Sequence, residues 1–293
     1  MFAVRGGVSD YGAGVITSVS NPKVKAVVRL RKGRERRRAG VFIAEGVREV
    51  GRAFGAGLRA EVVYRCDELL GEAAEVSLRG VAAVGVSEAV MRKMCWHQEP
   101  EGVLGVFETP AWDWERDLPA AAEDGLVLVL AGIEKPGNLG AMVRSAAAAG
   151  CGAVVSMGAD GAAELDAFAP QAIRNSTGSV FAMPVLGGLD AEEAVGRLRG
   201  AGYRIAAAVV PGFGAEAAVD VRAYDAVDWG ASNGWAVAIG PEDRGLGRQW
   251  ADWADELVSI PMAEDRRGVD SLNASVAAGV LLFHARSARR PSA

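Results

Sequence analysis

Apolar and polar positions along the first 108 residues follow two different periods. Runs rich in β-branched and aromatic residues have the pattern of strands and lie at 41–46, 60–65, 81–86 and 103–108. Segments with the helical period separate them and predict helices at 20–38, 46–56 and 88–95. This mixture predicts a small α/β unit over residues 16–108, preceded by a tail at 1–15.

The pattern changes between residues 109 and 125, where TPAWDWERDLPAAAEDG has two prolines, several acids and no sustained period. Such a segment is typical of a linker, which we place at 109–124. The run LVLVLAGI at 126–133 has the pattern of a strand buried on both faces, as in a parallel sheet. More strand-like runs follow at 153–157, 181–186, 204–210, 235–240 and 256–262. We therefore predict a second α/β unit with a parallel sheet over 125–293.

Composition narrows the class of protein. Half of the 293 residues are apolar, but the run at 126–133 is far shorter than the roughly 20 residues that cross a bilayer, so we expect no transmembrane helix. The segment 1–15 combines several glycines with a single arginine, which indicates a flexible tail rather than a secretion signal. Three cysteines without a C-x-x-C pair and two histidines argue against a disulfide framework and a metal site. We expect a cytoplasmic protein without a bound metal.

Positive charge is concentrated near the N-terminus. Residues 17–52 contain eleven basic and three acidic residues, about +8, which leaves about −13 for the rest of a chain whose net charge is −5. A solvated helix face is one interpretation. The other is an element that binds a polyanion, and Arg36, Arg37 and Arg38 favour it because solvated helices usually mix charge signs at i,i+4.

The first candidate for chemistry is the segment 134–140, EKPGNLG, which joins the strand at 126–133 to a helix at 139–149. Ligands of open α/β sheets collect beyond the carboxyl ends of strands, where helix N-termini offer free N–H groups. Asn138 can cap this helix, and Arg144, six residues on, projects near the same end of the sheet. The alternative is a turn that uses Pro, Gly and Asn for geometry alone.

Two further segments end apolar strands. The segment 239–245, IGPEDRG, has a glycine that permits close approach of the backbone to a ligand and is followed by two carboxylates and a guanidinium. The segment IPM at 260–262 leads to Asp270 and Ser271, either of which can cap a helix at 271–286. Asn273 would then lie inside the first turn, where an amide has poor helix propensity, so we expect it to have another task.

Two other patterns suggest different enzymes. The segment 212–217 matches G-x-G-x-x-A and would indicate a dinucleotide site, but Pro211 breaks the preceding strand and no convincing helix follows. Ser176 and Ser271 could indicate a hydrolase, yet the chain lacks G-x-S-x-G. Both patterns are weaker than the three segments at strand ends.

These segments together resemble the TrmH (SpoU) family of RNA ribose 2′-O-methyltransferases, in the SPOUT class. The matching stretches are EKPGNLGAMVRSAAAAG (134–150), AIRNSTGS (172–179), VAIGPEDRGL (237–246) and IPMAEDRRGVDSLNASVAAGVLLF (260–283). The stretches at 16–50 and 97–107 resemble the family's RNA-binding domain. The resemblance thus covers most of the chain outside the tail and the linker.

The resemblance implies an α/β fold with a C-terminal parallel-sheet SPOUT domain, knotted as a trefoil, and a smaller N-terminal α/β RNA-binding domain. It implies S-adenosylmethionine as cofactor, bound by Gly240, Ile260, Met262, Ser271 and Leu272. It also implies a homodimer in which Arg144 and Asn138 approach the other subunit's cofactor. The segment 263–270, AEDRRGVD, is more charged than the family's usual loop, so its cofactor contacts depart from the pattern.

The implied reaction transfers a methyl group to a ribose 2′-hydroxyl of RNA, most simply of 23S rRNA. The implied catalytic residues are Arg144, Asn138, Glu242, Ser271 and Asn273. Because a guanidinium gives up its proton reluctantly, we expect Arg144 to hold a phosphate or stabilise the developing alkoxide. The residues implied to bind RNA are Arg174, Lys25, Arg34, Arg36, Arg37 and Arg38.

Length and an Ala/Gly/Arg-rich composition resemble actinomycete members of the family that protect 23S rRNA from antibiotics, which adds antibiotic resistance as a possible role. Two alternatives from other classes stay open. A non-catalytic RNA-binding module would keep the basic segment and lose the cofactor pocket. A nicotinamide-dependent oxidoreductase would use the glycines at 212–217.

Overall fold

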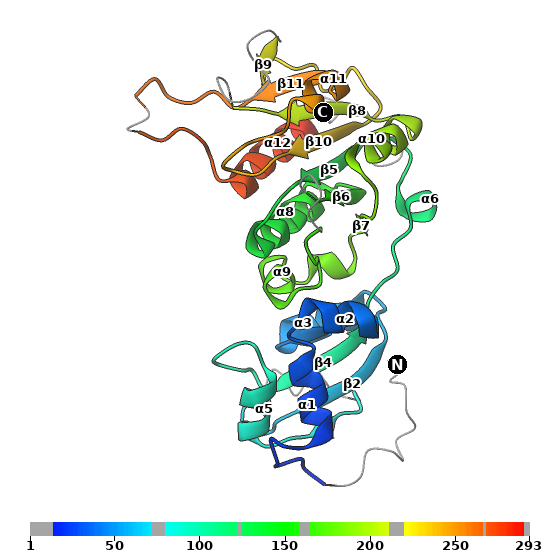
Figure 1. Cartoon of the computed structure of the whole chain (residues 1–293), viewed down its shortest axis with the longest axis vertical. Coiled ribbons are helices and arrows are strands. Elements are labelled where there is room, and N and C mark those ends of the chain that lie inside the picture. Colours follow the sequence, from blue (N-terminus) through cyan, green and yellow to red (C-terminus); the bar gives the residue numbers. More distant parts are fainter. Residues whose placement is uncertain are drawn as a thin grey trace. The chain divides into compact units, whose positions relative to one another are not determined.

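A computed structural model describes residues 14–71, 80–121, 125–158, 164–210, 220–265 and 268–289. The chain forms two compact units. The first comprises the chain up to Ala111 together with Phe168–Ala182, and the second comprises Trp112–Ala167 and Met183–Ala293. Each unit is built around its own sheet, shown in Figure 1.

The sheet of the first unit has the order β1-β4-β2-β3. Strand β4 is antiparallel to both β1 and β2, and β3 is parallel to β2. Residues 14–71 contain α1 (Pro22–Arg29), α2 (Gly33–Ala39), β1 (Val41–Glu45), α3 (Val47–Gly55) and β2 (Ala60–Arg65). Residues 80–111 contain β3 (Val84–Gly85), α5 (Glu88–Met94) and β4 (Val103–Glu108). The predicted α/β pattern of this unit is confirmed, although the strand expected at 81–86 is reduced to two residues.

The prediction of a single helix at 20–38 is wrong, because the helical conformation is interrupted between α1 and α2. Arg31 donates from Nη2 to the carbonyl oxygens of Lys93 (2.8 Å) and Cys95 (2.5 Å). Arg36 donates to the carbonyl oxygens of Leu30 (2.8 Å) and Arg31 (3.0 Å), which the ended helix leaves unpaired. Two arginines that look like part of a charged surface in the sequence therefore stabilise the turn.

Aromatic side chains hold the segment Phe168–Ala182 in the first unit. The ring of Phe42 on β1 stacks on those of Phe107 and Phe181, with centroid distances of 5.6 and 5.1 Å, and meets the tilted ring of Phe168 at 5.0 Å. The segment forms α9 (Pro170–Asn175) and the 3₁₀ helix η2 (Ser179–Phe181). A division of the chain at the linker alone assigns these residues to the second unit, since nothing in their local pattern shows that their aromatic rings pack against β1.

The second unit contains a seven-stranded sheet of order β7-β6-β5-β10-β8-β11-β9, in which every pairing is parallel. Its strands are β5 (Leu126–Ala131), β6 (Ala153–Met157), β7 (Val185–Leu186), β8 (Arg204–Ala208), β9 (Val221–Ala223), β10 (Trp235–Ile239) and β11 (Glu256–Ser259). Its helices are α6 (Trp114–Asp117), α8 (Pro136–Ala149), α10 (Ala191–Gly200), α11 (Gln249–Trp253) and α12 (Ala274–Ala288). The predicted parallel α/β class is confirmed.

Helices cover both faces of this sheet, which explains why β5 is apolar at every position. Val127 and Val129 share a buried cluster with Leu198 of α10 and Trp250 of α11. Successive strand residues point to opposite faces, so Leu128 lies on the other face. Helices α8 and α12 pack against each other and against β5, and they run side by side in Figure 1.

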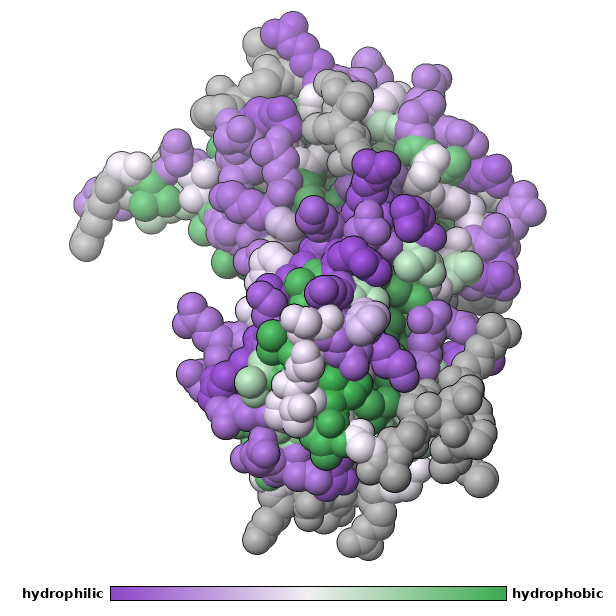
Figure 2. All heavy atoms as spheres, turned by 60° about the horizontal axis from the view of Figure 1, so that its bottom comes forward, coloured by the Kyte–Doolittle hydropathy of each residue, from purple (hydrophilic) through white to green (hydrophobic). Residues whose placement is uncertain are grey.

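None of the described helices is long and apolar enough to span a membrane. In the view of Figure 2, hydrophilic residues cover most of the visible surface and hydrophobic ones gather in smaller groups between them. The three cysteines, Cys66, Cys95 and Cys151, are buried and free.

Candidate active site

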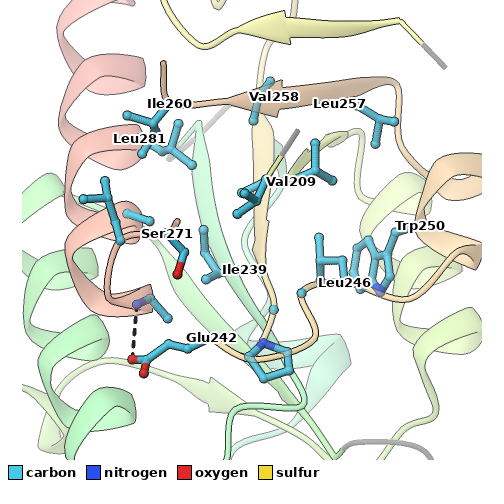
Figure 3. Close-up of a pocket in the computed structure, with 18 of the residues that line it drawn as sticks. Val209, Ile239, Glu242, Leu246, Trp250, Leu257, Val258, Ile260, Ser271 and Leu281 are labelled. Carbon is cyan, nitrogen blue, oxygen red and sulfur yellow. Dashed lines mark hydrogen bonds between the residues drawn. The ribbon is translucent and has the colours of Figure 1, made fainter. Parts of the chain in front are cut away.

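The carboxyl ends of β10 and β11 border a cavity of about 290 Å³. Because all strands of this sheet run in one direction, the loops that follow them lie at one edge, where α/β proteins bind ligands. The walls are largely apolar and include Val209, Ile239, Leu246, Trp250, Leu257, Val258 and Leu281. Figure 3 shows these side chains around the cavity, with Glu242 at its lower edge.

The five residues predicted to bind the cofactor come together in this cavity. Gly240 follows β10, Ile260 and Met262 follow β11, and Ser271 and Leu272 precede α12, and all five line the same space. These residues come from segments that are separated in the sequence. The parallel sheet and the packing of α12 bring them together.

Gly240 is required by close packing of the backbone. A Cβ at this position would lie 2.6 Å from the backbone carbon of Gly245 and 2.6 Å from the nitrogen of Leu246. Such distances are well inside van der Waals contact, so the turn 240–246 can close on itself only around a glycine. Residues of this turn also form one wall of the cavity.

Glu242 is the centre of a polar network at the edge of the cavity. Its Oε1 accepts hydrogen bonds from Nδ2 of Asn138 (2.7 Å) and Nδ2 of Asn273 (2.5 Å), and a longer one from the backbone N–H of Ala274 (3.4 Å). Its Oε2 lies 3.1 Å from Nζ of Lys135. Three segments of the second unit, 135–138, the one around Glu242 and 273–274, are thus joined at one carboxylate. Asn138, Glu242 and Asn273 are the members of this network that were predicted as catalytic residues.

This network favours the charged form of Glu242. The hydrogen bond from Asn138, and then the one from Lys135, lower the pKa of Glu242 below its ordinary value of 4.5. The carboxylate is therefore ionised at neutral pH and places a fixed negative charge beside the cavity.

Both asparagines have places different from those predicted. Helix α8 begins at Pro136 with Lys135 as N-cap, so Asn138 lies in the first turn and its amide is free to reach Glu242. Helix α12 begins at Ala274, and its N-cap is Asn273 rather than Asp270 or Ser271. Oδ1 of Asn273 caps the helix by accepting from the backbone N–H of Ser275 (3.0 Å), while its Nδ2 donates to Glu242.

Arg144 lies on α8 and is exposed. Within the described residues its side chain forms neither a hydrogen bond nor an ion pair. It does not belong to the Glu242 network, and its exposed guanidinium is available to an anion from outside the chain.

The predicted RNA-binding arginines separate into two kinds. Lys25, Arg34, Arg37 and Arg38 are exposed on α1 and α2. Arg36 is 5% exposed and satisfies carbonyl groups between the helices, so its prediction as a residue that faces RNA is wrong. The consecutive arginines diverge because successive residues of a helix point about 100° apart.

Arg174 is exposed on α9 and belongs to the first unit, whereas the residues of the Glu242 network belong to the second. Ser176, considered above as a hydrolase nucleophile, is fully buried and donates from Oγ to the carbonyl oxygen of Ile173. That role is structural. The G-x-G-x-x-A match at 212–217 lies outside the described residues, as do two positions of the charged segment 263–270.

Sequence reasoning gave no role to Lys135 or to the apolar wall formed by Leu246 and Trp250. Lys135 lies in the stretch 134–150, three residues before Asn138, and this spacing could have indicated that both side chains reach the same group. Trp250 gives no such signal, because a buried tryptophan of a core and one of a cavity wall have the same sequence pattern.

Comparisons with known proteins agree with this geometry. The model of the SpoU rRNA Methylase family matches residues 125–283, and the model of an MRM3-like substrate binding domain matches residues 21–105. A 23S rRNA (uridine(2479)-2'-O)-methyltransferase from Streptomyces viridochromogenes is 31% identical over 258 residues, 86% of this chain and 84% of that protein.

Solved structures of similar proteins cover nearly the whole chain. An RNA 2'-O ribose methyltransferase has a TM-score of 0.78 and 34% identity, covering 94% of this chain and 99% of the other. The SpoU methyltransferase AviRb from Streptomyces viridochromogenes, in complex with AdoMet, has a TM-score of 0.76 and 27% identity, covering 92% and 98%. From these matches and the cavity at the strand ends, the chain belongs to the SpoU rRNA methylase family.

Proposed function

We propose that this protein transfers a methyl group from S-adenosylmethionine to a ribose 2′-hydroxyl of 23S rRNA. The observation that carries the proposal is the convergence of Gly240, Ile260, Met262, Ser271 and Leu272 on one cavity at the carboxyl edge of the sheet. The names of the relatives support the reaction and the substrate, and the complex of AviRb with AdoMet supports the cofactor.

The cavity suits S-adenosylmethionine chemically. Its aliphatic walls and the indole of Trp250 suit a flat adenine ring. The carboxylates of Glu242, Asp243 and Asp270 suit the positive charges of the ligand. When bound, this cofactor supplies a methyl group on a sulfonium, which is already a good leaving group.

The protein must then position the ribose and stabilise the charge that develops on its oxygen. We assign positioning to Asn138, Asn273 and Ser271, with Glu242 fixing both amides. Holding the hydroxyl at about 3–3.5 Å from the methyl carbon lowers the barrier by several kcal/mol through proximity. Arg144 would bind the adjacent phosphate or stabilise the alkoxide, which a fixed cation does more easily than accept a proton.

RNA binding is assigned to the exposed cations of the first unit. Lys25, Arg34, Arg37 and Arg38 have exposed side chains on two neighbouring helices, and Arg174 is exposed on α9. Cations presented in this way attract the phosphates of a nucleic acid. The match to a substrate binding domain over 21–105 supports this assignment. We propose residues 16–108 as the RNA-binding domain, 109–124 as the linker and 125–293 as the methyltransferase domain, except that 168–182 pack in the first unit and count with the RNA-binding domain.

We also propose a homodimer, through the exposed face of α12. Val276 and Phe283 on this helix are each 51% exposed, and they lie seven residues apart, on one side. Burial of these side chains against a second copy would remove apolar surface from water. The N-terminal end of α12 carries Asn273, so such an interface would lie close to the site and let Arg144 serve the other subunit.

Complementation tests the shared site. Subunits with Arg144→Ala and subunits with Leu272→Arg, which blocks the cavity, should each be inactive as homodimers. A mixed dimer of the two should recover activity, because one of its sites has an intact cavity and an intact Arg144. Verified mixed dimers without activity would show that each subunit works alone.

Three finer parts of the proposal follow from the family. The segment after β10 would pass through a loop to form the trefoil knot, the protein would act in the cytoplasm, and methylation would protect the ribosome from an antibiotic. The resistance role predicts that expression in a susceptible host raises the inhibitory concentration of a 23S-directed antibiotic. An unchanged inhibitory concentration with a methylated ribosome would contradict it.

Calorimetric titration separates the proposed function from its two alternatives. We expect S-adenosylmethionine to bind and to raise the unfolding temperature by mass action, while NAD does neither. RNA binding without S-adenosylmethionine binding would favour the non-catalytic module. Binding of NAD would favour the oxidoreductase.

A further inference from the structure

A second cavity, of about 410 Å³, lies wholly within the first unit. Three segments line it: the end of β1 with the start of α3, the loop 95–101, and helix α9. Its volume is within the range of small-molecule sites, and none of its lining residues belongs to the active site described above.

The loop at this cavity is fixed by hydrogen bonds. Glu45 accepts the backbone N–H groups of Trp96 (2.6 Å) and His97 (3.1 Å), and Glu101 accepts that of Val47 (3.1 Å). Burial raises the pKa of Glu45, against the effect of these hydrogen bonds. Since Gly46 has a φ of +95°, a side chain there would be strained and would meet Glu101 at 2.9 Å. The loop is thus held closely against β1.

This fixed loop presents a tryptophan to solvent. Trp96 is 59% exposed, and in the described part of the chain neither its ring nor its indole N–H has a partner. Because Glu45 fixes the backbone N–H of Trp96 while the ring stays exposed, this large aromatic side chain does not contribute to the core. Planar, exposed aromatic rings of this kind bind unstacked bases of single-stranded RNA.

The described charged groups that line the cavity leave one guanidinium, that of Arg174, for an incoming anion. Its four carboxylates have protein partners: besides Glu45 and Glu101, Glu49 pairs with Arg48 (2.7 Å) and Glu99 lies 3.6 Å from Arg92. Arg174, which also lines the cavity, has no side-chain partner among the described residues. A neighbouring guanidinium without a partner suits the phosphate of a nucleotide.

We propose that this cavity binds one unpaired nucleotide of the RNA substrate, with its base stacked on Trp96 and its phosphate bound by Arg174. The proposal rests on the proposed function, because it names a contact that selects a single-stranded region of that RNA. It predicts recognition of a loop or bulge, since bases in a duplex cannot reach the indole face.

Binding of a mixed-sequence single-stranded RNA decanucleotide, compared with the same sequence as a duplex, tests the subsite. The wild type should prefer the single strand. Trp96→Ala should weaken single-strand binding about 10-fold, the scale for loss of one stacked base, and Trp96→Phe should retain most of it. Arg174→Gln should lower the salt slope by about one, whereas Arg59→Gln, which removes an exposed arginine outside the cavity, should change the affinity less than about twofold.

Unfolding temperatures and S-adenosylmethionine titrations of the same variants provide the controls, and both should match the wild type. Wild-type affinity for single strands in Trp96→Ala, or no preference of the wild type over the duplex, would overturn the subsite. If the wild type fails to bind S-adenosylmethionine, the proposed function fails, and loss of single-strand binding in Trp96→Ala would still support the subsite.

Discussion

Replacement of Gly240 by alanine isolates the close backbone approach that shapes the cofactor cavity. The added Cβ would lie 2.6 Å from the backbone carbon of Gly245 and 2.6 Å from the nitrogen of Leu246, about 1 Å inside ordinary contact. Because both obstacles are backbone atoms, a rotamer change cannot relieve the overlap. The turn 240–246 must move, and it carries Glu242 as well as one wall of the cavity.

The expected cost follows from this geometry. Overpacking of one methyl group against a fixed structure costs about 1–3 kcal/mol. If the cofactor-bound form requires the original turn, this free energy opposes binding, and the dissociation constant for S-adenosylmethionine should rise roughly 5- to 100-fold. The stabilisation that the cofactor gives against unfolding should fall correspondingly.

Calorimetry and thermal unfolding with and without S-adenosylmethionine measure both effects. The matched control is Gly196→Ala, at a helical glycine of α10 in the same unit where a Cβ meets nothing within 4 Å. This control should gain about 0.5–1 kcal/mol of stability from helix propensity and keep the wild-type affinity. Wild-type affinity in Gly240→Ala would refute the reasoning, because the cavity would then not depend on the packed turn.

Three further predictions concern charged residues. Because hydrogen bonds lower the pKa of Glu242 below 4.5, the stability that its charged form contributes is complete above that pH and is lost as the pH falls further. The free energy of unfolding, measured with urea, should therefore fall more on acidification in the wild type than in Glu242→Gln, and parallel pH curves would contradict this. Arg144→Ala should reduce methyl transfer on the order of 10²-fold without changing the unfolding temperature or cofactor affinity, and a near-normal rate would remove Arg144 from the mechanism. Arg36→Ala should lower the free energy of unfolding by about 1–3 kcal/mol, because it leaves carbonyl groups unpaired, while Arg37→Ala should leave stability unchanged and lower the salt slope of RNA binding by about one. Loss of stability in Arg37→Ala together with a lower salt slope in Arg36→Ala would contradict the structural role of Arg36.

Periodicity predicted the elements well where the pattern itself causes the structure. The apolar run at 126–133 can be stable only between two layers, and it forms β5 in the interior of the parallel sheet. The glycine at 240 is predicted to let the backbone approach a ligand, whereas the atoms that crowd it in the structure are backbone atoms of Gly245 and Leu246.

Local patterns do not show which distant groups a side chain meets. With Asp270 or Ser271 as the predicted N-cap, Asn273 falls inside the first helical turn, yet in the structure Asn273 is itself the N-cap and its amide donates to Glu242. Arg36 appears equivalent to Arg37 in the sequence, and only the break between α1 and α2 makes it a buried donor. The docking of 168–182 on Phe42 depends on ring contacts across more than a hundred residues.

Mass spectrometry of nucleosides from methylated RNA tests the central claim most directly. Purified protein is incubated with unmodified 23S rRNA and isotopically labelled S-adenosylmethionine, and the RNA is digested to nucleosides. The account predicts labelled methyl on a ribose 2′-oxygen at one position, and loss of this product in Arg144→Ala. Label on a base, or no transfer by a folded protein that binds both the cofactor and the RNA, would contradict it.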